Sequence, residues 1–454
     1  MPDEAVEEPQ WGRLLLTGGI HWSLNGRKDR TAQQSRDLHI PHILRSLCDA
    51  KIVKIVTGHA ANYGMAIDIR GNAWLFGKCP AIALGANTNG VISEQAPLKI
   101  RPFETGCGLG VKFVGGAAGK GNAFLLDSDG GAWGCGTNHC AQLGLNLRRE
   151  AEVSEFTKID GPWGDAKIVQ ITAGWTFTLF LTEEGEVYGA GSHESGQLGS
   201  GKTGARLMKA NKMYHDLESY PILIRGLEGH KIVQIASGNQ HSLAMSDDGL
   251  VWAWGCAGYS RLGLEDTRDR LEPTMIPAFA GREMSRASAI TCGPTNSVVI
   301  DRSGRYWMAG KWKITGDGST GQPYSSFKNI QEINGCRALK TSSGGCTHFI
   351  TTPTDEDGIQ TIGWGQGVLY GELGLGDTMS STKPVAIEAL EGVDVIDIAA
   401  GAFFTMFLAR PGGKLSDLDR YPEHVNSSDI CIVCEESDHQ LTLECEKAST
   451  SQAA

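Results

Sequence analysis

The sequence lacks the features that would direct a chain into or across a membrane. No run reaches 18 apolar residues, so no membrane span is predicted. The first ten residues, MPDEAVEEPQ, are acidic and do not have the basic-then-apolar form of a secretory signal. The 12 cysteines are scattered mostly inside strand-like runs, as small buried hydrophobes would be. We therefore expect a protein of an intracellular, reducing compartment, the nucleus or the cytoplasm.

Catalytic signatures are also missing. The sequence contains no nucleophile elbow, no His-x-His or His-Glu-x-x-His pattern and no distinctive pair of acids. It predicts no cofactor and no covalent chemistry. The formal net charge of −11 argues against direct, sequence-independent binding to nucleic acid phosphates, although it leaves room for one local basic patch.

Glycine is present in excess, with 60 of 454 residues spread along the chain. That is about twice the usual share of roughly 7%. The stretch from Ile232 to Leu264 contains three short apolar runs, separated by Gly238 and by the turn Asp247-Asp248-Gly249. Each run has strand length, and the breaks carry turn residues. Such a meander cannot bury its faces alone, so repetition is expected.

The first apolar run of this unit, together with the glycine that ends it, occurs seven times along the chain, and we call it the first half of the unit. Successive copies of this glycine are separated by 61, 55, 64, 55, 51 and 57 residues. A period near 50 residues that is built of strands indicates a propeller or a similar array. The seven anchor glycines are Gly58, Gly119, Gly174, Gly238, Gly293, Gly344 and Gly401.

The second half of the unit follows only six anchors. The half that is missing after Gly401 is found at the other end of the chain, as Leu14-Leu15-Leu16-Thr17-Gly18. Strands from both termini would then complete one blade and leave no open sheet edge. We predict an all-β chain with an acidic N-terminal tail (1–10), a seven-bladed β-propeller closed by the N-terminal strand (11–410) and a short, disordered, acidic C-terminal tail (411–454).

A Leu-Gly loop follows the second half in most units, and the sequence of the blades resembles a known family. Stretches such as GNQHSLAMSDDGLVWAWG and GELGLGD are similar to the regulator of chromosome condensation family. GRLLLTGGIHWSLNGRKD, AGYSRLG and an aberrant fifth blade resemble its telophase-disc mitotic branch in particular. The long basic N-terminal extension of that branch has no counterpart here.

This resemblance implies a non-catalytic interaction protein. The family includes a guanine nucleotide exchange factor for a nuclear Ras-like GTPase, and it docks on nucleosomes. The telophase-disc branch is linked to chromosomes, the spindle and small GTPases of the Rac, Arf and Ral type. We therefore expect a monomeric regulator of a small Ras-like GTPase, although the family's exchange hairpin has no recognisable match in the sequence. The alternative is a scaffold for a chromatin or spindle protein that has no GTPase activity.

Residues 202–220 form an insertion that stands out as a candidate partner-binding element. The insertion is either a loop that binds a partner on the rigid propeller or a solvated surface loop without a function. Its cations suggest one helical face that includes Arg206, Lys209 and possibly Lys212. The candidate partner-binding residues are Lys202, Arg206, Lys209, Lys212, Arg27 and Lys28.

Three further patterns have simpler interpretations. Residues 196–203 match GxxxxGK[ST], but they follow the third strand of a meander, so we interpret them as a Leu-Gly loop rather than a phosphate cradle. His241 has asparagine or phenylalanine at the equivalent positions of other units, which indicates packing rather than catalysis. The tail has an incomplete zinc pattern, and we expect no metal there; the weak candidate ligands are Cys431, Cys434, His439 and Cys445.

Overall fold

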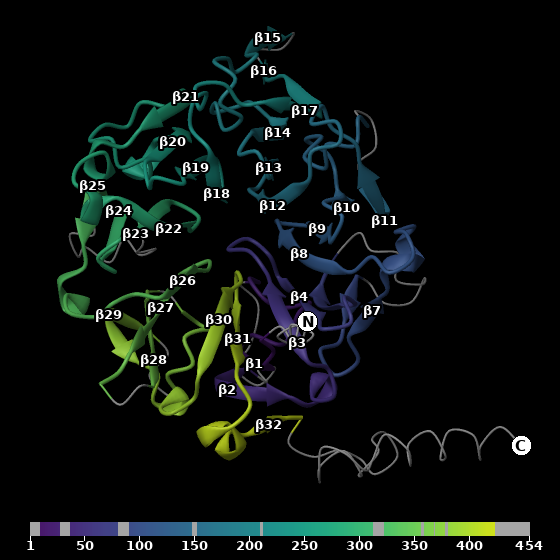
Figure 1. The fold of residues 1–454 in the computed structure, drawn as a ribbon, viewed down its shortest axis with the longest axis vertical. Coiled ribbons are helices and arrows are strands. Elements are labelled where there is room, and N and C mark those ends of the chain that lie inside the picture. The colour runs from purple at the N-terminus through teal and green to yellow at the C-terminus, as the bar shows by residue number, and fades with distance from the viewer. Residues whose placement is uncertain are drawn as a thin grey trace, which may run out of the picture.

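The computed structural model of the chain is a ring of seven antiparallel sheets, each one blade of a β-propeller (Figure 1). The structure describes residues 10–27, 37–79, 90–147, 152–208, 212–311, 322–355, 358–366, 368–376 and 380–422. The first strand of each blade is the innermost strand, and the following strands lie progressively further out. The predicted all-β, seven-bladed architecture is confirmed.

The first three blades come from residues 52–223. Blade 1 consists of β3 (Ile52–Val56), β4 (Tyr63–Asp68), β5 (Ala73–Lys78), β6 (Val91–Ile92) and β7 (Leu98–Ile100). Blade 2 consists of β8 (Phe113–Ala118), β9 (Asn122–Asp127), β10 (Ala132–Thr137) and β11 (Glu152–Ile159). Blade 3 consists of β12 (Ile168–Ala173), β13 (Phe177–Thr182), β14 (Val187–Ser192) and β17 (Leu217–Leu223).

The next three blades repeat this order. Blade 4 consists of β18 (Ile232–Ser237), β19 (His241–Ser246), β20 (Val251–Gly255) and β21 (Arg270–Met275). Blade 5 consists of β22 (Ala287–Cys292), β23 (Asn296–Asp301), β24 (Tyr306–Gly310) and β25 (Tyr324–Asn329). Blade 6 consists of β26 (Lys340–Ser343), β27 (Thr347–Pro353), β28 (Ile359–Gly365) and β29 (Ser381–Ala386).

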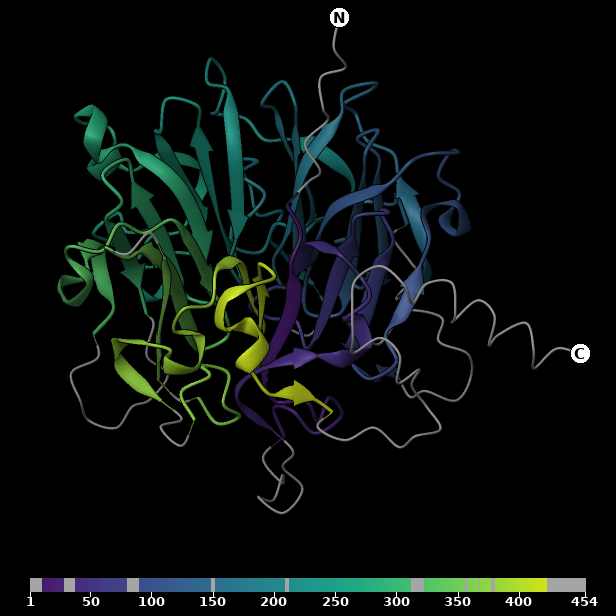
Figure 2. The same cartoon turned by 60° about the horizontal axis from the view of Figure 1, so that its bottom comes forward.

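Blade 7 closes the ring with strands from both ends of the chain. Its order is β30 (Val395–Ala400), β31 (Phe404–Ala409), β1 (Arg13–Gly18), β2 (Leu38–Leu44) and β32 (Arg420–Tyr421). β1 pairs with β31 along its whole length, from Arg13 opposite Ala409 to Gly18 opposite Phe404. Figure 2 shows the purple N-terminal strands beside the yellow C-terminal ones. The predicted closure by the N-terminal strand is confirmed.

Ordered structure continues beyond residue 410, where the repeat pattern stops. A 3-10 turn, η10 (Gly413–Asp417), is followed by β32, which pairs in parallel with β2. β32 covers the outer edge of blade 7, as a capped edge strand requires. The tail therefore contributes to the fold up to Pro422, and residues 423–454 lie outside the described residues.

The remaining regular structure consists of short 3-10 turns, most of them between blades. None of the helices in the described part of the chain is long and apolar enough to span a membrane. These turns are η2 (Arg45–Leu47), η3 (Pro102–Thr105), η5 (Gly258–Ser260), η6 (Pro277–Phe279), η7 (Glu283–Ser285), η8 (Gln331–Ile333) and η9 (Glu388–Leu390).

The anchor glycines are required by close packing at the turn after each innermost strand. A Cβ atom at Gly238 would lie 2.0 Å from the ring of His241 and 2.8 Å from the carbonyl oxygen of Gly293 in the next blade. Neighbouring turns also bond to one another, since the amide of Asn239 donates to the carbonyl of Pro294. The His59 ring lies 2.9 Å from the side-chain oxygen of Asn239, which ties blade 1 to blade 4. These contacts make the ring rigid at that end.

The Leu-Gly loops hold adjacent blades together. A hydroxyl in the second strand of one blade donates to the backbone carbonyl that precedes the Leu-Gly pair of the preceding blade. Ser242 bonds in this way to Gln197, Ser297 to Arg261 and Thr405 to Glu372, at 2.6–3.0 Å. The fully buried indole of Trp254 donates to the same Gln197 carbonyl at 2.9 Å. Buried polar groups are thereby paired between blades, which explains the recurrence of the motif.

Candidate partner-binding face

The strand order divides the loops between two faces of the ring. In an antiparallel four-stranded blade, the connections after strands one and three lie at one end, and the connection after strand two lies at the other. The first end carries the Leu-Gly loops, and we call it the Leu-Gly face. The second carries turns such as 246–250 and 301–305, and we call it the turn face. The insertion 202–216 and Arg27 both belong to loops of the Leu-Gly face.

The insertion forms a β-hairpin, not the helix that its cations suggested. β15 (Arg206–Met208) pairs with β16 (Lys212–Tyr214) as a separate two-stranded sheet. Leu207 lies opposite Met213, and Arg206 lies opposite Tyr214. Each strand is a cation followed by two apolar residues, a pattern too short to distinguish a strand from a helix, and the cross-strand pairing defines the element. Figure 1 shows the hairpin at the outer rim of the ring, beyond β14 and β17.

The base of the hairpin is fixed by ion pairs. The guanidinium of Arg206 contacts the carboxylate of Asp216. Lys202 Nζ lies 3.6 Å from an oxygen of Glu218, and the same oxygen lies 2.9 Å from the buried His193 ring. Two of the predicted cations are therefore neutralised locally, and the positive charge here is smaller than the sequence indicated.

Three apolar side chains of the hairpin are exposed, which the pattern of cations did not predict. Leu207, Met213 and Tyr214 are 68%, 56% and 62% exposed. Leu207 and Met213 lie on one face of the hairpin because they are opposite one another. A surface pocket of about 400 Å³ lies at the base of the hairpin, lined by Arg206, His215, Asp216, Leu217 and Glu218. Exposed apolar groups that are held on a rigid element are typical of a binding surface.

Of the other predicted cations that the structure describes, one belongs to the hairpin and one does not. Arg27 is exposed, but it lies in the β1–β2 loop of blade 7, away from blade 3 across the ring. Lys212 begins β16. Lys28 and Lys209 lie outside the described residues, as do Cys431, Cys434, His439 and Cys445. No group of three or more His, Cys, Asp or Glu side chains among the described residues could hold a metal ion.

Residues 196–203, which match the phosphate-binding pattern GxxxxGK[ST], form a Leu-Gly loop that continues into the base of the hairpin. No helix follows it, and its lysine, Lys202, lies close to Glu218. A Cβ atom at Gly199 would lie 3.1 Å from the Trp254 indole nitrogen in the next blade, so this glycine serves packing. The loop therefore lacks the strand–loop–helix geometry that binds phosphate.

His241 is a packing residue, as the repeat comparison predicted. Its ring is fully buried, and Nε2 lies 3.2 Å from the Asn296 carbonyl oxygen and 3.1 Å from Ser297 Oγ. Burial holds the pKa of this imidazole well below its usual value. A neutral ring that bridges blades 4 and 5 has no access to a substrate proton.

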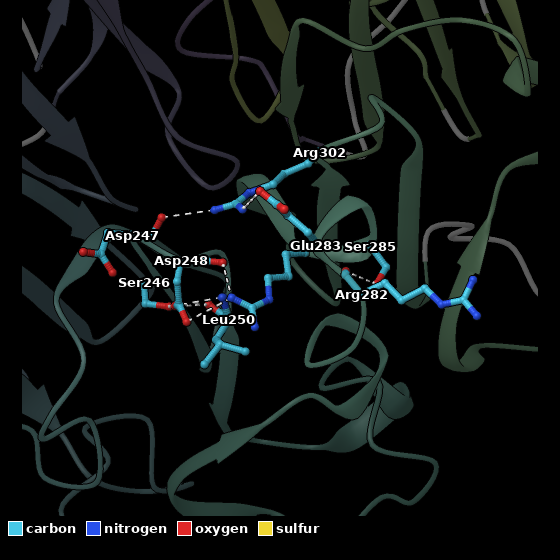
Figure 3. Close-up of polar contacts among 9 residues, drawn as sticks. Ser246, Asp247, Asp248, Leu250, Arg282, Glu283, Ser285 and Arg302 are labelled. Carbon is cyan, nitrogen blue, oxygen red and sulfur yellow. Dashed lines mark hydrogen bonds and ion pairs between the residues drawn. The ribbon is translucent and has the colours of Figure 1, made fainter.

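A second polar surface lies on the turn face, where blades 4 and 5 meet (Figure 3). Arg302 lies 3.3 Å from the Glu283 carboxylate and donates to the backbone carbonyl of Asp247 at 3.3 Å. Arg286 Nη1 lies 3.2 Å from the Asp248 carboxylate. The backbone amide of Arg302 also donates to the Arg286 carbonyl, so the two arginines belong to one contiguous surface.

More cations extend this surface without described ion pairs. The stem of Arg337 packs over Gly304. Three other cations are exposed within four residues of Arg286, Arg302 or Arg337 in the sequence, namely Arg282, Arg305 and Lys340. Within the part of the chain that the structure describes, none of these four makes an ion pair. We call this set, together with Arg286 and Arg302, the blade 5 arginine surface.

Comparisons with known proteins agree with this architecture. The family described as the RCC1-like domain matches residues 17–407. Protein RCC2 homolog from Xenopus laevis is 28% identical over 422 residues, which cover 88% of this chain and 78% of that protein. Human Protein RCC2 is 27% identical, with coverage of 88% and 76%.

A solved structure has the same fold at lower identity. The crystal structure of Prp20p from Saccharomyces cerevisiae, which was described together with its binding to Gsp1p and histones, has a TM-score of 0.70. It is 21% identical and covers 90% of this chain and 94% of its own. The match of the family over residues 17–407 extends from the closing strand β1 into β31, its partner in blade 7. This chain belongs to the RCC1-like domain family.

Proposed function

We propose that this protein is a non-catalytic propeller that regulates a small Ras-like GTPase by docking it on the Leu-Gly face. The observation that carries the proposal is the hairpin β15–β16, which displays Leu207, Met213 and Tyr214 on a base fixed by ion pairs. A preformed apolar element loses little conformational entropy when a partner binds. The binding of Prp20p to Gsp1p, together with the implied role of the family in nucleotide exchange, supports a GTPase as the partner.

Exchange on such a surface needs no covalent step. The hairpin would bind the GTPase best when its nucleotide is absent, since only a differential affinity for the two states can drive release. The apolar pair Leu207 and Met213 would pack against the region that otherwise contacts Mg²⁺ and phosphate. The cations at the base would remain paired with Asp216 and Glu218, and they would orient the hairpin rather than bind the nucleotide.

The test is the affinity of the full chain for purified Rac-, Arf-, Ral- and nuclear Ras-type GTPases in nucleotide-free and GDP-loaded forms. We expect one nucleotide-free form to bind at least about tenfold more tightly than its loaded form. Leu207→Asp combined with Met213→Asp should weaken this binding at least about tenfold, because two exposed apolar contacts are lost.

The matched control is Met284→Asp, which changes a similarly exposed apolar residue on the turn face. It should leave GTPase binding unchanged. Equal affinity for loaded and empty GTPases would contradict a role in exchange. Unchanged binding by the doubly substituted hairpin would contradict its role in docking.

The blade 5 arginine surface favours a second candidate function, a scaffold for an acidic chromatin partner. Arginine suits the recognition of carboxylate groups. Four of the six cations of the blade 5 arginine surface make no ion pair among the described residues. We expect Arg282→Glu with Arg337→Glu to weaken binding of the full chain to nucleosome core particles at least about tenfold at 0.1 M salt, with GTPase binding unchanged. If the wild-type chain shows no salt-sensitive nucleosome binding, the scaffold function is wrong.

A further inference from the structure

The Leu-Gly loop of blade 4 departs at one position from those of blades 2, 3 and 6. In blades 2, 3 and 6 the residue before the Leu-Gly pair is Gln142, Gln197 or Glu372. Its side-chain oxygen accepts a hydrogen bond from the amide two residues earlier, at 2.8–2.9 Å. Blade 4 has Arg261 there, and a guanidinium has no acceptor. Its Nε instead donates to the Gly258 carbonyl at 2.7 Å.

This change exposes Tyr259. Without the acceptor, the amide of Tyr259 is not held in the loop, and the residue adopts a left-handed backbone with φ of 60°. This conformation is uncommon for a bulky residue and is typical of functional sites when it persists. Tyr259 is 51% exposed, whereas Tyr370, at the same position in blade 6, is 7% exposed and accepts a hydrogen bond from the Gly26 amide.

Two cations without carboxylate partners lie beside the Tyr259 ring. Lys311 Nζ lies 5.0 Å from the ring centroid, and the guanidinium carbon of Arg261 lies 5.8 Å from it. Arg261 is only 4% exposed, and its Nη1 has no hydrogen-bond partner. Among the described residues neither cation makes an ion pair. A buried charge without a hydrogen-bonded ion pair destabilises a protein, so an anion bound at the surface of this loop would offset part of that cost.

We propose that Tyr259 and Lys311 form a receptor for an aspartate or glutamate side chain of the protein partner. The Tyr259 hydroxyl, which has no hydrogen bond to any described residue, would donate to the carboxylate. Lys311 would supply the neighbouring positive charge, and Arg261 would act from beneath as a positioning residue. Because the guanidinium fork of Arg261 is buried and cannot bind a ligand in the bidentate manner, the receptor offers the acidic side chain one hydroxyl donor and one ammonium group.

This inference rests on the proposed function, since the receptor lies on the Leu-Gly face. The loop of blade 3, which carries the hairpin, contacts blade 4 directly, because the amide of Gly201 donates to the Leu271 carbonyl at 2.9 Å. The hairpin and the loop of Tyr259 therefore belong to adjacent blades on the same face, and we infer that one partner contacts both. The partner would then present an acidic side chain to Tyr259 and Lys311 beside the apolar surface that binds the hairpin.

The experiment measures two affinities of the full chain. One is for the nucleotide-free GTPase panel, and the other is for a fluorescein-labelled peptide Gly-Leu-Glu-Glu-Phe-Gly, with its Gln-for-Glu counterpart as the reference. We expect Lys311→Glu to weaken both at least about tenfold, less so in 0.5 M salt. Tyr259→Phe should weaken both about threefold or more because the donor is lost. Lys311→Arg should retain binding. The matched control is Lys328→Glu, which changes a similar lysine–tyrosine pair on β25.

The outcomes separate the two proposals. If the peptide binds in a way that depends on Tyr259 and Lys311 while no GTPase binds, the receptor stands and the proposed function is wrong. If a GTPase binds but the variants bind it and the peptide as the wild type does, the receptor is overturned and the proposed function stands. Equal binding of the Glu and Gln peptides, or binding of neither, also overturns the receptor.

Discussion

Leu15→Asp is expected to destabilise the whole propeller by at least about 4 kcal/mol, a large part of the stability of a typical domain. Leu15 is fully buried in β1, between β31 and β2. It packs in the core between blades 6 and 7 with Ile43, Phe349 and Phe407. A carboxylate there has no partner, and the strand it occupies joins the two ends of the chain. Loss of β1 would therefore break the closure of the whole ring and would not be confined to one loop.

Urea unfolding followed by tryptophan fluorescence measures this effect. Leu207→Asp is the matched control, because it makes the same change at an exposed position of the hairpin. The control should change the free energy of unfolding by no more than about 0.5 kcal/mol. A wild-type midpoint for Leu15→Asp would mean that β1 does not close the ring.

The second large effect concerns the charge of Glu372. Its buried side chain occupies the position of Gln142 and Gln197 and accepts the same type of hydrogen bond. Burial raises its pKa from 4.5 to about 7. Between these values the folded state binds more protons than the unfolded state, so stability falls as the pH rises from about 4.5 to 7. Above pH 7 the loss is complete.

Glu372→Gln should therefore stabilise the protein by about 2–3 kcal/mol at pH 8 and have little effect at pH 4.5. The neutral amide keeps the acceptor, as it does in the two other blades. Gln197→Glu is the mirror variant: it should introduce a comparable loss of stability above pH 7. Thermal and urea unfolding at pH 4.5, 6 and 8 give the comparison. A Glu372→Gln variant with the pH dependence of the wild type would contradict this assignment.

The architecture could be predicted from the sequence because each blade repeats the same local constraints. At the position of Gly238 in each unit, the turn packs against the next blade and only glycine fits. The number of these glycines along the sequence therefore gives the number of blades. The half-blade at Leu14–Gly18 could be matched to Gly401 because the strand missing after that anchor is present at the other end of the chain. The contribution of residues 411–422 to blade 7 could not be predicted, because β32 is two residues long and depends on pairing with β2.

The surface that we propose for binding was only partly predictable. The insertion was located correctly, but its strands are three residues long, too short for a periodic signal to exclude a helix. The neutralisation of Arg206 by Asp216 depends on the hairpin bringing together residues ten positions apart. Tyr259 is exposed in the one of these loops that has arginine in place of glutamine or glutamate, at position 261. A comparison of the Leu-Gly loops with one another could have found that departure.

Hydrogen exchange of the full chain with and without the nucleotide-free GTPase tests the central claim most directly, namely that the partner docks on the Leu-Gly face. The account predicts that amides of residues 206–214 and 256–261 gain protection in the complex, while those of 282–286 and 302–305 on the turn face do not. Protection confined to the turn face, with the hairpin exchanging as in the free protein, would contradict it.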